Sequence, residues 1–382
     1  MSVTAALGFE AAAVAAGLKS SGGLDLAIVV NRGPLQHAAA VFTSNRSKAN
    51  PIIWSQQVIA DGTVSAIVLN SGGANCFTGA QGFQVTHATA EAVAESIGVS
   101  AGDVLVCSTG LIGDQLPLEK VLAGVAAASA ALGNHGDNAS LAIMTTDSTP
   151  KRSIKLGPGY TIGAMAKGAG MLAPGLATML VVITTDAAVQ SAALDRALRE
   201  ATRLSFDRLD SDGCMSTNDQ VSLLASGASG VTPHEAEFTE LLTEVCHDLA
   251  EQLQADAEGA SHDIRIEVIG AASEDDAVAV GRSVARNNLF KAAVFGNDPN
   301  WGRVLAAIGT TDATFDPYDV DVSMNGVRVC HAGGPDRPRI EVDLSPRRVE
   351  LLIDLRAGND TATILTNDLT HDYVHENSAY AS

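Results

Sequence analysis

The sequence predicts an α/β fold with α+β-type layers, in which sheets are covered by helices. Short runs of Val, Ile and Leu, typical of buried strands, recur throughout the 382 residues. Longer segments with apolar residues at helical spacing lie between them without strict alternation, which indicates a layered arrangement. Hydrophobic residues make up 46% of the chain, enough for one large core or two coupled ones.

The first half of the chain is expected to contain three strands and two helices. Continuous apolar runs predict strands at residues 24–30, 66–69 and 104–107. Ala-rich stretches with helical periodicity predict helices at residues 85–97 and 121–132.

The second half is richer in both elements. Apolar and alternating runs predict strands at residues 179–185, 264–268, 320–324, 339–343, 350–354 and 361–365. Helical periodicity predicts helices at residues 194–204, 235–251 and 275–287. The second of these helices places Phe238, Leu241, Leu242 and Val245 on one face. We find no internal repeat and no low-complexity linker, so no domain boundary is evident.

The net charge of −20 argues against a nucleic-acid partner, because a phosphate polymer would be repelled. Residues 1–177 carry 9 Lys/Arg and 10 Asp/Glu, whereas residues 178–382 carry 15 and 34. This asymmetry indicates an acidic solvated surface on the second half.

A cytoplasmic protein without a membrane segment is expected. No apolar stretch approaches the ~20 residues needed to cross a bilayer. The first residues lack a basic region and include Glu10, which argues against a secretory signal. The five cysteines are widely spaced and never form a C-x-x-C pair, which indicates reduced thiols. They are Cys76, Cys107, Cys214, Cys246 and Cys330.

The most unusual stretch is residues 164–180, AMAKGAGMLAPGLATML. Lys167 lies among small and apolar residues, which fits either a surface lysine or a cation held for a ligand. Thr178 follows a Pro-Gly turn and fits two interpretations. It is either an ordinary strand threonine or a nucleophile whose hydroxyl attacks the Ala177 carbonyl. Hydrolysis of the resulting ester would leave an N-terminal amine as a base beside that hydroxyl.

Residues 167–180, KGAGMLAPGLATML, closely resemble the signature of the ornithine acetyltransferase family. Further blocks resemble this family in the same order, nearly from end to end. They are VFTSNR at 41–46, LNSGGANCFTG at 69–79, CSTGLIG at 107–113, IMTTD at 143–147, STND at 216–219, DAEG at 256–259, DPNWGRVLAAIG at 298–309 and the closing residues 368–382. The resemblance implies an N-terminal-nucleophile-like sandwich of sheets covered by helices, of the ornithine acetyltransferase/DmpA type.

The resemblance also implies self-cleavage between Ala177 and Thr178. Residues 1–177 would then form an alpha chain and residues 178–382 a beta chain, together one interlocked unit, with two copies of each in a heterotetramer. Thr178 would be the nucleophile, and Thr109 and Gly110 would form the oxyanion hole.

Substrate contacts are implied for Thr145, Lys167, Thr178, Glu258, Asn377 and Ser382. Lys167 suits the α-carboxylate of an N-acetylated amino acid, and Thr145 and Asn377 suit its polar groups. Glu258 suits the δ-ammonium group of N-acetylornithine.

The implied reaction is ping-pong transfer of acetyl from N2-acetyl-L-ornithine to Thr178 and then to L-glutamate, in cyclic arginine biosynthesis. Its products are L-ornithine and N-acetyl-L-glutamate. No metal or other cofactor is expected. Some members of the family also use acetyl-CoA as a donor, and no residue of this sequence decides that question.

The sequence departs from the family pattern at Ala257, Ser261-His262, Cys214-Met215 and Ser382. The terminal serine keeps the hydroxyl of the usual threonine. The Ser261-His262 pair replaces Thr-Lys and leaves the role of that basic position open.

Three other patterns suggest different chemistry. The glycines of residues 168–173 imitate a dinucleotide fingerprint, but Pro174 leaves no room for the required helix. His371 and His375 have the spacing of two metal ligands, yet a third ligand is missing, which favours a surface pair. Cys107 follows an apolar run, which favours a core thiol over a nucleophile.

Two further functions fit the same residues. An autoprocessed amidohydrolase or aminopeptidase would share the acyl-enzyme and use water in place of glutamate. A non-enzymatic relative used for binding would show neither cleavage nor acetyl transfer.

Overall fold

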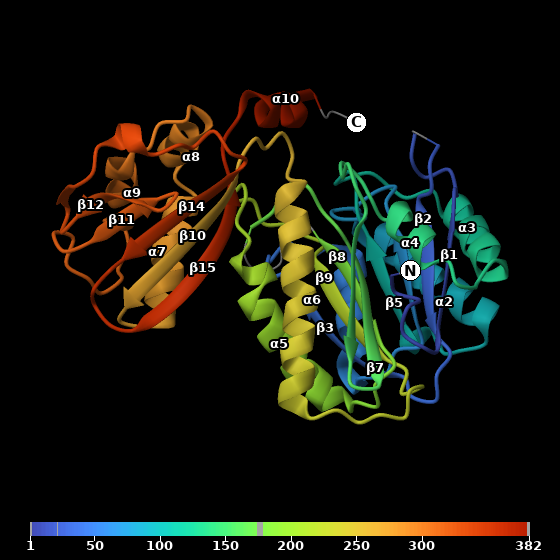
Figure 1. Cartoon of the computed structure of the whole chain (residues 1–382). Helices are drawn as coiled ribbons and strands as arrows, with labels where there is room; N and C mark the ends of the chain where they lie inside the picture. The colour runs from blue at the N-terminus through green and yellow to red at the C-terminus, as the bar shows by residue number, and fades with distance from the viewer. Residues whose placement is uncertain (1, 21, 174–178, 380–382) are drawn as a thin grey trace. The chain divides into compact units, whose positions relative to one another are not determined.

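The structure, a computed structural model, describes residues 2–20, 22–173 and 179–379 (Figure 1). Ala177, Thr178 and Ser382 lie outside the described residues. The chain forms two compact units. Unit 1 consists of Met1–Ala169, Gly175–Phe206 and Met215–Leu253, and unit 2 of Gly170–Pro174, Asp207–Cys214 and Gln254–Ser382.

Unit 1 contains two sheets. The first has the order β1-β2-β4-β5, with β1 at Phe9–Val14, β2 at Leu26–Asn31, β4 at Ala66–Asn70 and β5 at Val104–Ser108. The second has the order β3-β9-β8-β7-β6, with β3 at His37–Phe42, β6 at Lys151–Gly157, β7 at Tyr160–Lys167, β8 at Leu180–Thr185 and β9 at Gln220–Ala225. The pairs β4–β5 and β8–β9 are parallel, and the other pairs are antiparallel.

Apolar side chains of both sheets form one core between them, which includes Ile67, Leu105, Met165 and Val182. On the other face of the first sheet, α2 and α3 contribute to a second apolar cluster. Helices α5 and α6 cover the second sheet, where Gln252 and Asp248 of α6 hydrogen-bond to β6. The helix bounds are α1 Asn50–Val58, α2 Gly79–Ile97, α3 Leu118–Ala130, α4 Gly136–Ala142, α5 Ser191–Leu204 and α6 Glu235–Ala255. This arrangement confirms the predicted sandwich of sheets covered by helices.

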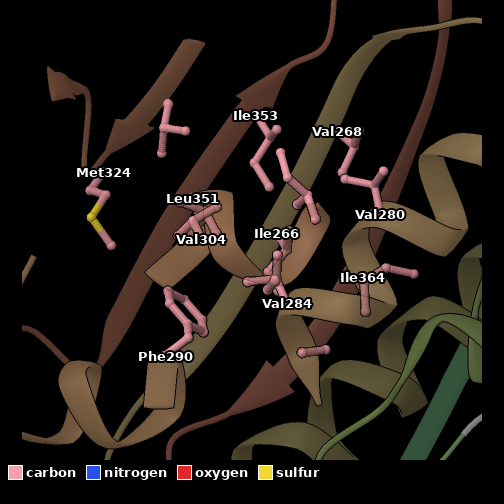
Figure 2. Close-up of a cluster of buried hydrophobic side chains, with 14 of the residues drawn as sticks. Ile266, Val268, Val280, Val284, Phe290, Val304, Met324, Leu351, Ile353 and Ile364 are labelled. Atoms are coloured by element: carbon pink, nitrogen blue, oxygen red, sulfur yellow. The ribbon is translucent and has the colours of Figure 1, made fainter. Parts of the chain in front are cut away.

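Unit 2 is a six-stranded sheet packed against helices, in the order β13-β12-β11-β14-β10-β15. Figure 2 shows its core, in which Ile266 and Leu351 of the sheet lie close to Val284, Phe290 and Val304 of the helices. The strands are β10 Asp263–Ala271, β11 Asp321–Met324, β12 Val327–His331, β13 Gly334–Pro335, β14 Arg348–Asp354 and β15 Asp360–Asn367. The helices are α7 Glu274–Ala285, α8 Asn288–Phe295, α9 Trp301–Ile308 and α10 His371–Ala379.

The strand predicted at residues 339–343 is wrong. Residues Arg339–Glu341 form a 3₁₀ turn, and Ile340 is 93% exposed. The alternation of apolar and polar residues suggested a strand, but no neighbouring strand pairs with this segment among the described residues. Instead, Arg339 pairs with Asp298, and Glu341 pairs with Arg337 four residues earlier.

Two smaller predictions are confirmed, that Cys107 is a core thiol and that His371 and His375 lie at the surface. Cys107 is buried, and burial raises the pKa of its thiol. His371 and His375 are both exposed on α10. No helix within the described ranges has the length and apolar character needed to span a membrane.

Candidate functional site

The loop after β5 carries Thr109 and Gly110 and is fixed to the glycine-rich loop after β4. The Thr109 N–H donates to the Asn70 carbonyl, and the Thr109 carbonyl accepts the Gly73 N–H, both at 3.0 Å. Gly110 has a φ of +128°, and a Cβ there would lie 2.8 Å from the Gly73 nitrogen. Only glycine fits this position, so the backbones of the two loops can approach closely here.

The buried Lys167 orients the Thr109 hydroxyl. Lys167 ends β7 and is 1% exposed, and its Nζ donates to Thr109 Oγ1 at 3.3 Å. Because an ammonium group has no acceptor, the hydroxyl accepts this bond and keeps its own proton for another acceptor. The Gly110 N–H also donates to no acceptor within the described part of the chain. Two adjacent donors of this kind are what an oxyanion hole requires.

Asp147 ties together the segments that carry Thr145 and Lys167. Its Oδ1 accepts the Lys151 ammonium at 2.6 Å and the Gly168 N–H at 2.7 Å, and its Oδ2 accepts the Thr145 N–H at 2.9 Å. The side chains of Asp147 and Lys151 are 0% and 1% exposed. Burial opposes ionisation, but the Lys167 and Lys151 ammonium groups hold the pKa of the Asp147 carboxyl below its usual value.

The start of β8 lies beside the end of β7. Leu180 pairs with Lys167 in the antiparallel register of these strands. The Met179 N–H donates to Asp219 Oδ1 at 3.2 Å, and the Met179 carbonyl accepts the Gln220 N–H at 3.2 Å. The residue that follows Thr178 in sequence is therefore held from both sides, next to the lysine that orients Thr109.

Glu258 and Asn377 form a second pair, in unit 2. Asn377 Nδ2 donates to Glu258 Oε2 at 3.0 Å. The Glu258 carboxylate packs on Gly170, where any side chain would collide with it. Burial, followed by repulsion from Glu258, raises the pKa of Glu376. A concentration of negative charge of this kind attracts cations.

A close backbone contact fixes the start of α10, the helix that carries Asn377. Gly259 has a φ of +62°, and a Cβ there would overlap the Tyr373 nitrogen. Thr370 Oγ1 donates to the Gly259 carbonyl at 2.6 Å and accepts the Tyr373 N–H at 2.9 Å. The turn that carries Glu258 and the start of α10 are thus joined.

Two of the departures from the family pattern, at His262 and Ala257, have structural explanations. The His262 ring lies between Asp368 Oδ2 and the Leu344 carbonyl, at 2.7 and 3.0 Å, and is buried. This imidazole therefore has a packing role within unit 2. Ala257 lacks a positive φ, so a glycine is not needed there.

The structure thus groups Thr109, Gly110, Thr145 and Lys167 in unit 1, and pairs Glu258 with Asn377 in unit 2. Asp147, Lys151 and Asp219 were not predicted as site residues. Their partners lie on other elements, and single buried charges give no periodic signal in a sequence.

Comparison with known proteins identifies the family. A model of the ArgJ family matches residues 10–382. The arginine biosynthesis bifunctional protein ArgJ of Streptomyces avermitilis is 63% identical over 383 residues, which cover 100% of both chains. Its namesake from Mycobacterium leprae is 55% identical over 100% of this chain and 96% of its own.

Two solved structures also match. Ornithine acetyltransferase of Mycobacterium tuberculosis, solved in complex with ornithine, is 49% identical, covering 47% of this chain and 96% of its own, with a TM-score of 0.43. The arginine biosynthesis bifunctional protein of Bacillus halodurans is 33% identical, covering 52% and 97%, with a TM-score of 0.49. On the strength of the family match and the full-length relatives, the chain belongs to the ArgJ family.

Proposed function

We propose that this enzyme transfers the acetyl group of N2-acetyl-L-ornithine to L-glutamate through an acetyl-Thr178 intermediate. The curated relatives are named as bifunctional proteins of arginine biosynthesis. A relative that is 49% identical was solved with ornithine bound. Ornithine is the product that the first half of this reaction would release.

The active nucleophile arises by self-cleavage. Thr178 Oγ attacks the Ala177 carbonyl, the carbon–nitrogen bond breaks, and the proton of the hydroxyl passes to the nitrogen of residue 178. Water then hydrolyses the ester and leaves residues 1–177 and residues 178–382 as separate chains. The new amine of Thr178 serves as the general base for its own hydroxyl.

Acetyl transfer repeats the same chemistry on a substrate. Thr178 Oγ attacks the acetyl carbonyl, and the ornithine nitrogen takes the proton that the Thr178 amine removed from the hydroxyl. The amine of glutamate then attacks the acetyl ester, and its proton returns to Thr178 Oγ through the same base. The acetyl group stays on an amino-acid nitrogen at both ends of the cycle, so no external energy source is needed.

One observation carries the proposal: Thr109 Oγ1 accepts a hydrogen bond from the buried Lys167 ammonium, at 3.3 Å. This bond directs the proton of the hydroxyl away from the lysine. The neighbouring Gly110 N–H donates to no acceptor among the described residues. Both donors would stabilise the negative charge that develops on the attacked carbonyl oxygen. The same lysine offers a positive charge for the α-carboxylate of the substrate.

The Glu258–Asn377 pair of unit 2 would recognise ornithine. Glu258 would bind the δ-ammonium, with Asn377 fixing the orientation of its carboxylate. Thr145 and the terminal Ser382 would add polar contacts. A heterotetramer of two alpha and two beta chains, and the use of acetyl-CoA as a second donor, belong to the same proposal.

Intact-mass measurement tests the proposal. Purified protein should give two fragments, of which the later begins Thr-Met-Leu, and N-acetylornithine should add one acetyl group to that fragment. Thr178→Ala should abolish cleavage and adduct together, whereas Thr178→Ser retains a hydroxyl and should keep part of each. An active enzyme with an unbroken chain would refute the mechanism.

The choice of acceptor separates this function from that of an amidohydrolase. For the transferase, glutamate should accelerate the loss of the acetyl adduct and appear as N-acetylglutamate. Loss of the adduct at a rate independent of glutamate would instead identify water as the acceptor.

A further inference from the structure

Lys19 is a partly exposed lysine whose ammonium group lies beside the segment that carries Thr145. Its Nζ donates to the Met144 carbonyl at 2.7 Å and to the Leu24 carbonyl at 3.1 Å. The C=O and C–N bond lengths of the peptide between Met144 and Thr145 then place Nζ no more than about 5.3 Å from the Thr145 nitrogen. Lys19 is not among the site residues that the family resemblance implies.

The loop that carries Lys19 packs directly against the glycine-rich loop after β4. A Cβ at Gly72 would overlap the Cβ of Leu18, so the approach of the two loops requires a glycine there. The next residue, Gly73, donates its N–H to the Thr109 carbonyl at 3.0 Å. Lys19 and the proposed oxyanion residues therefore lie on segments that are fixed to the same loop, all within unit 1.

The charge of Lys19 is not balanced by a direct ion pair within the described part of the chain. An ammonium group has three N–H donors, and the two carbonyls take up only two of them. Two carboxylates act on this charge from further away, and both are bound elsewhere. Those of Asp25 accept three backbone N–H groups, and those of Asp147 accept the Lys151 ammonium and two backbone N–H groups. Lys19 thus has a donor and a positive charge left for an anion.

Lys19 and Lys167 act on each other as two like charges. Burial lowers the pKa of the Lys19 ammonium, and repulsion from Lys167 adds to this fall, although the Asp25 and Asp147 carboxylates oppose it. A carboxylate that contacts both ammonium groups would remove this repulsion and would replace the water that Lys19 loses on burial.

We propose that Lys19 binds the α-carboxylate of the substrate together with Lys167. This inference rests on the proposed function. The α-carboxylate is the one anionic group of N2-acetyl-L-ornithine, and glutamate carries the same group. A carboxylate has two oxygens, so it can accept a hydrogen bond from each of the two lysines. Both halves of the reaction would therefore depend on Lys19.

A pair of substrates separates carboxylate binding from a structural role of Lys19. The α-carboxamide of N2-acetyl-L-ornithine keeps the acetyl group and the δ-ammonium but lacks the negative charge. In Lys19→Met, we expect kcat/KM for formation of the acetyl adduct to fall about tenfold with N2-acetyl-L-ornithine and less than about twofold with the carboxamide. Self-cleavage, followed by intact mass, should proceed at the wild-type rate, because it involves no substrate carboxylate.

Lys120→Met is the matched control. The exposed Lys120 of α3 donates to the Gly17 carbonyl at 2.8 Å, on the same loop and two residues before Lys19. This variant also removes a cation and a contact of that loop, but it should keep the wild-type preference for the acid over the carboxamide. Lys19→Gln, whose amide can still donate a hydrogen bond but carries no charge, should lose this preference as Lys19→Met does.

The outcomes separate the two proposals. If wild-type protein forms no acetyl adduct from N2-acetyl-L-ornithine, the proposed function fails, and the role of Lys19 fails with it. If wild-type protein does form the adduct, equal losses for the two substrates in Lys19→Met overturn the role of Lys19 alone. An equal loss of preference in Lys120→Met would do the same. Should Lys19→Met fail to fold, a wild-type preference in Lys19→Gln overturns the role.

Discussion

At the scale of single residues, the oxyanion site depends on one hydroxyl whose direction is set by a buried lysine. Thr109→Val keeps the shape of the side chain and removes the donor. We expect kcat for acetyl transfer to fall about 100-fold or more, with KM nearly unchanged, since the lost bond forms only in the transition state. Thr109→Ser keeps the hydroxyl and serves as the control, and a similar loss in that variant would contradict this role.

Asp147 links two parts of the site, and replacing it should lower the stability of the folded protein. In a Thr178→Ala background, which keeps the chain in one piece, Asp147→Asn leaves Lys151 buried without its anionic partner. We expect a cost of about 3 kcal/mol near neutral pH, measured as a fall in the thermal midpoint. The exposed Asp114→Asn provides the control.

The effect of Asp147→Asn should depend on pH in a defined direction. The pKa of Asp147 is lower in the folded protein than in the unfolded chain. Its carboxylate therefore stabilises the folded state at any pH above the pKa that it has in the unfolded chain. That contribution disappears as the pH falls through the folded value. The difference in thermal midpoint between wild type and Asp147→Asn should therefore become smaller as the pH is lowered. A difference that grows would contradict the ion pair.

At the scale of elements, the turn before α10 sets the place of Asn377. Gly259→Ala forces a methyl group against the Tyr373 nitrogen and should displace the helix. We expect KM for N-acetylornithine to rise about tenfold, while self-cleavage continues at the wild-type rate. Gly98→Ala is the matched control, since Gly98 also has a positive φ, +77°, but nothing lies within 4 Å of an added Cβ.

The sequence predicted some strands well and missed others, among them β1, β3, β6, β7 and β9. The apolar runs of β2, β4, β5 and β8 were found within two residues of their observed bounds. Strands β6 and β7 were missed, because Lys151 begins one and Lys167 ends the other. Charged residues at strand ends suggest solvent, and only the fold shows that these two lysines are buried near Asp147.

The site residues, too, were predicted only in part. Thr109, Gly110 and Lys167 were predicted from a family resemblance, and the structure places them together. Asp147 and Asp219 act through backbone N–H groups 21 and 40 residues away in sequence, at Gly168 and Met179. Such bonds depend on chain topology, which local patterns do not encode.

At the scale of the whole molecule, the proposed cleavage would divide one sheet between two chains. In the order β3-β9-β8-β7-β6, residues 1–177 supply β3, β7 and β6, and residues 178–382 supply β9 and β8 between them. Each fragment therefore completes the hydrogen bonding of the other. We expect the fragments to separate on a denaturing gel and to elute together in native chromatography, where dissociation after cleavage would contradict this sheet.

The position of β8 and β9 between strands of the first half also bears on protein synthesis. His37 pairs with Ala225, so the ribosome completes β3 long before its neighbour exists. Contacts this distant in sequence form slowly, and the nascent first half waits with unpaired strand edges. A chain that ends prematurely before β9 would thus be unable to complete its sheet or to activate itself. We expect such a product to be bound by chaperones and degraded by proteases rather than to act as a partly working enzyme.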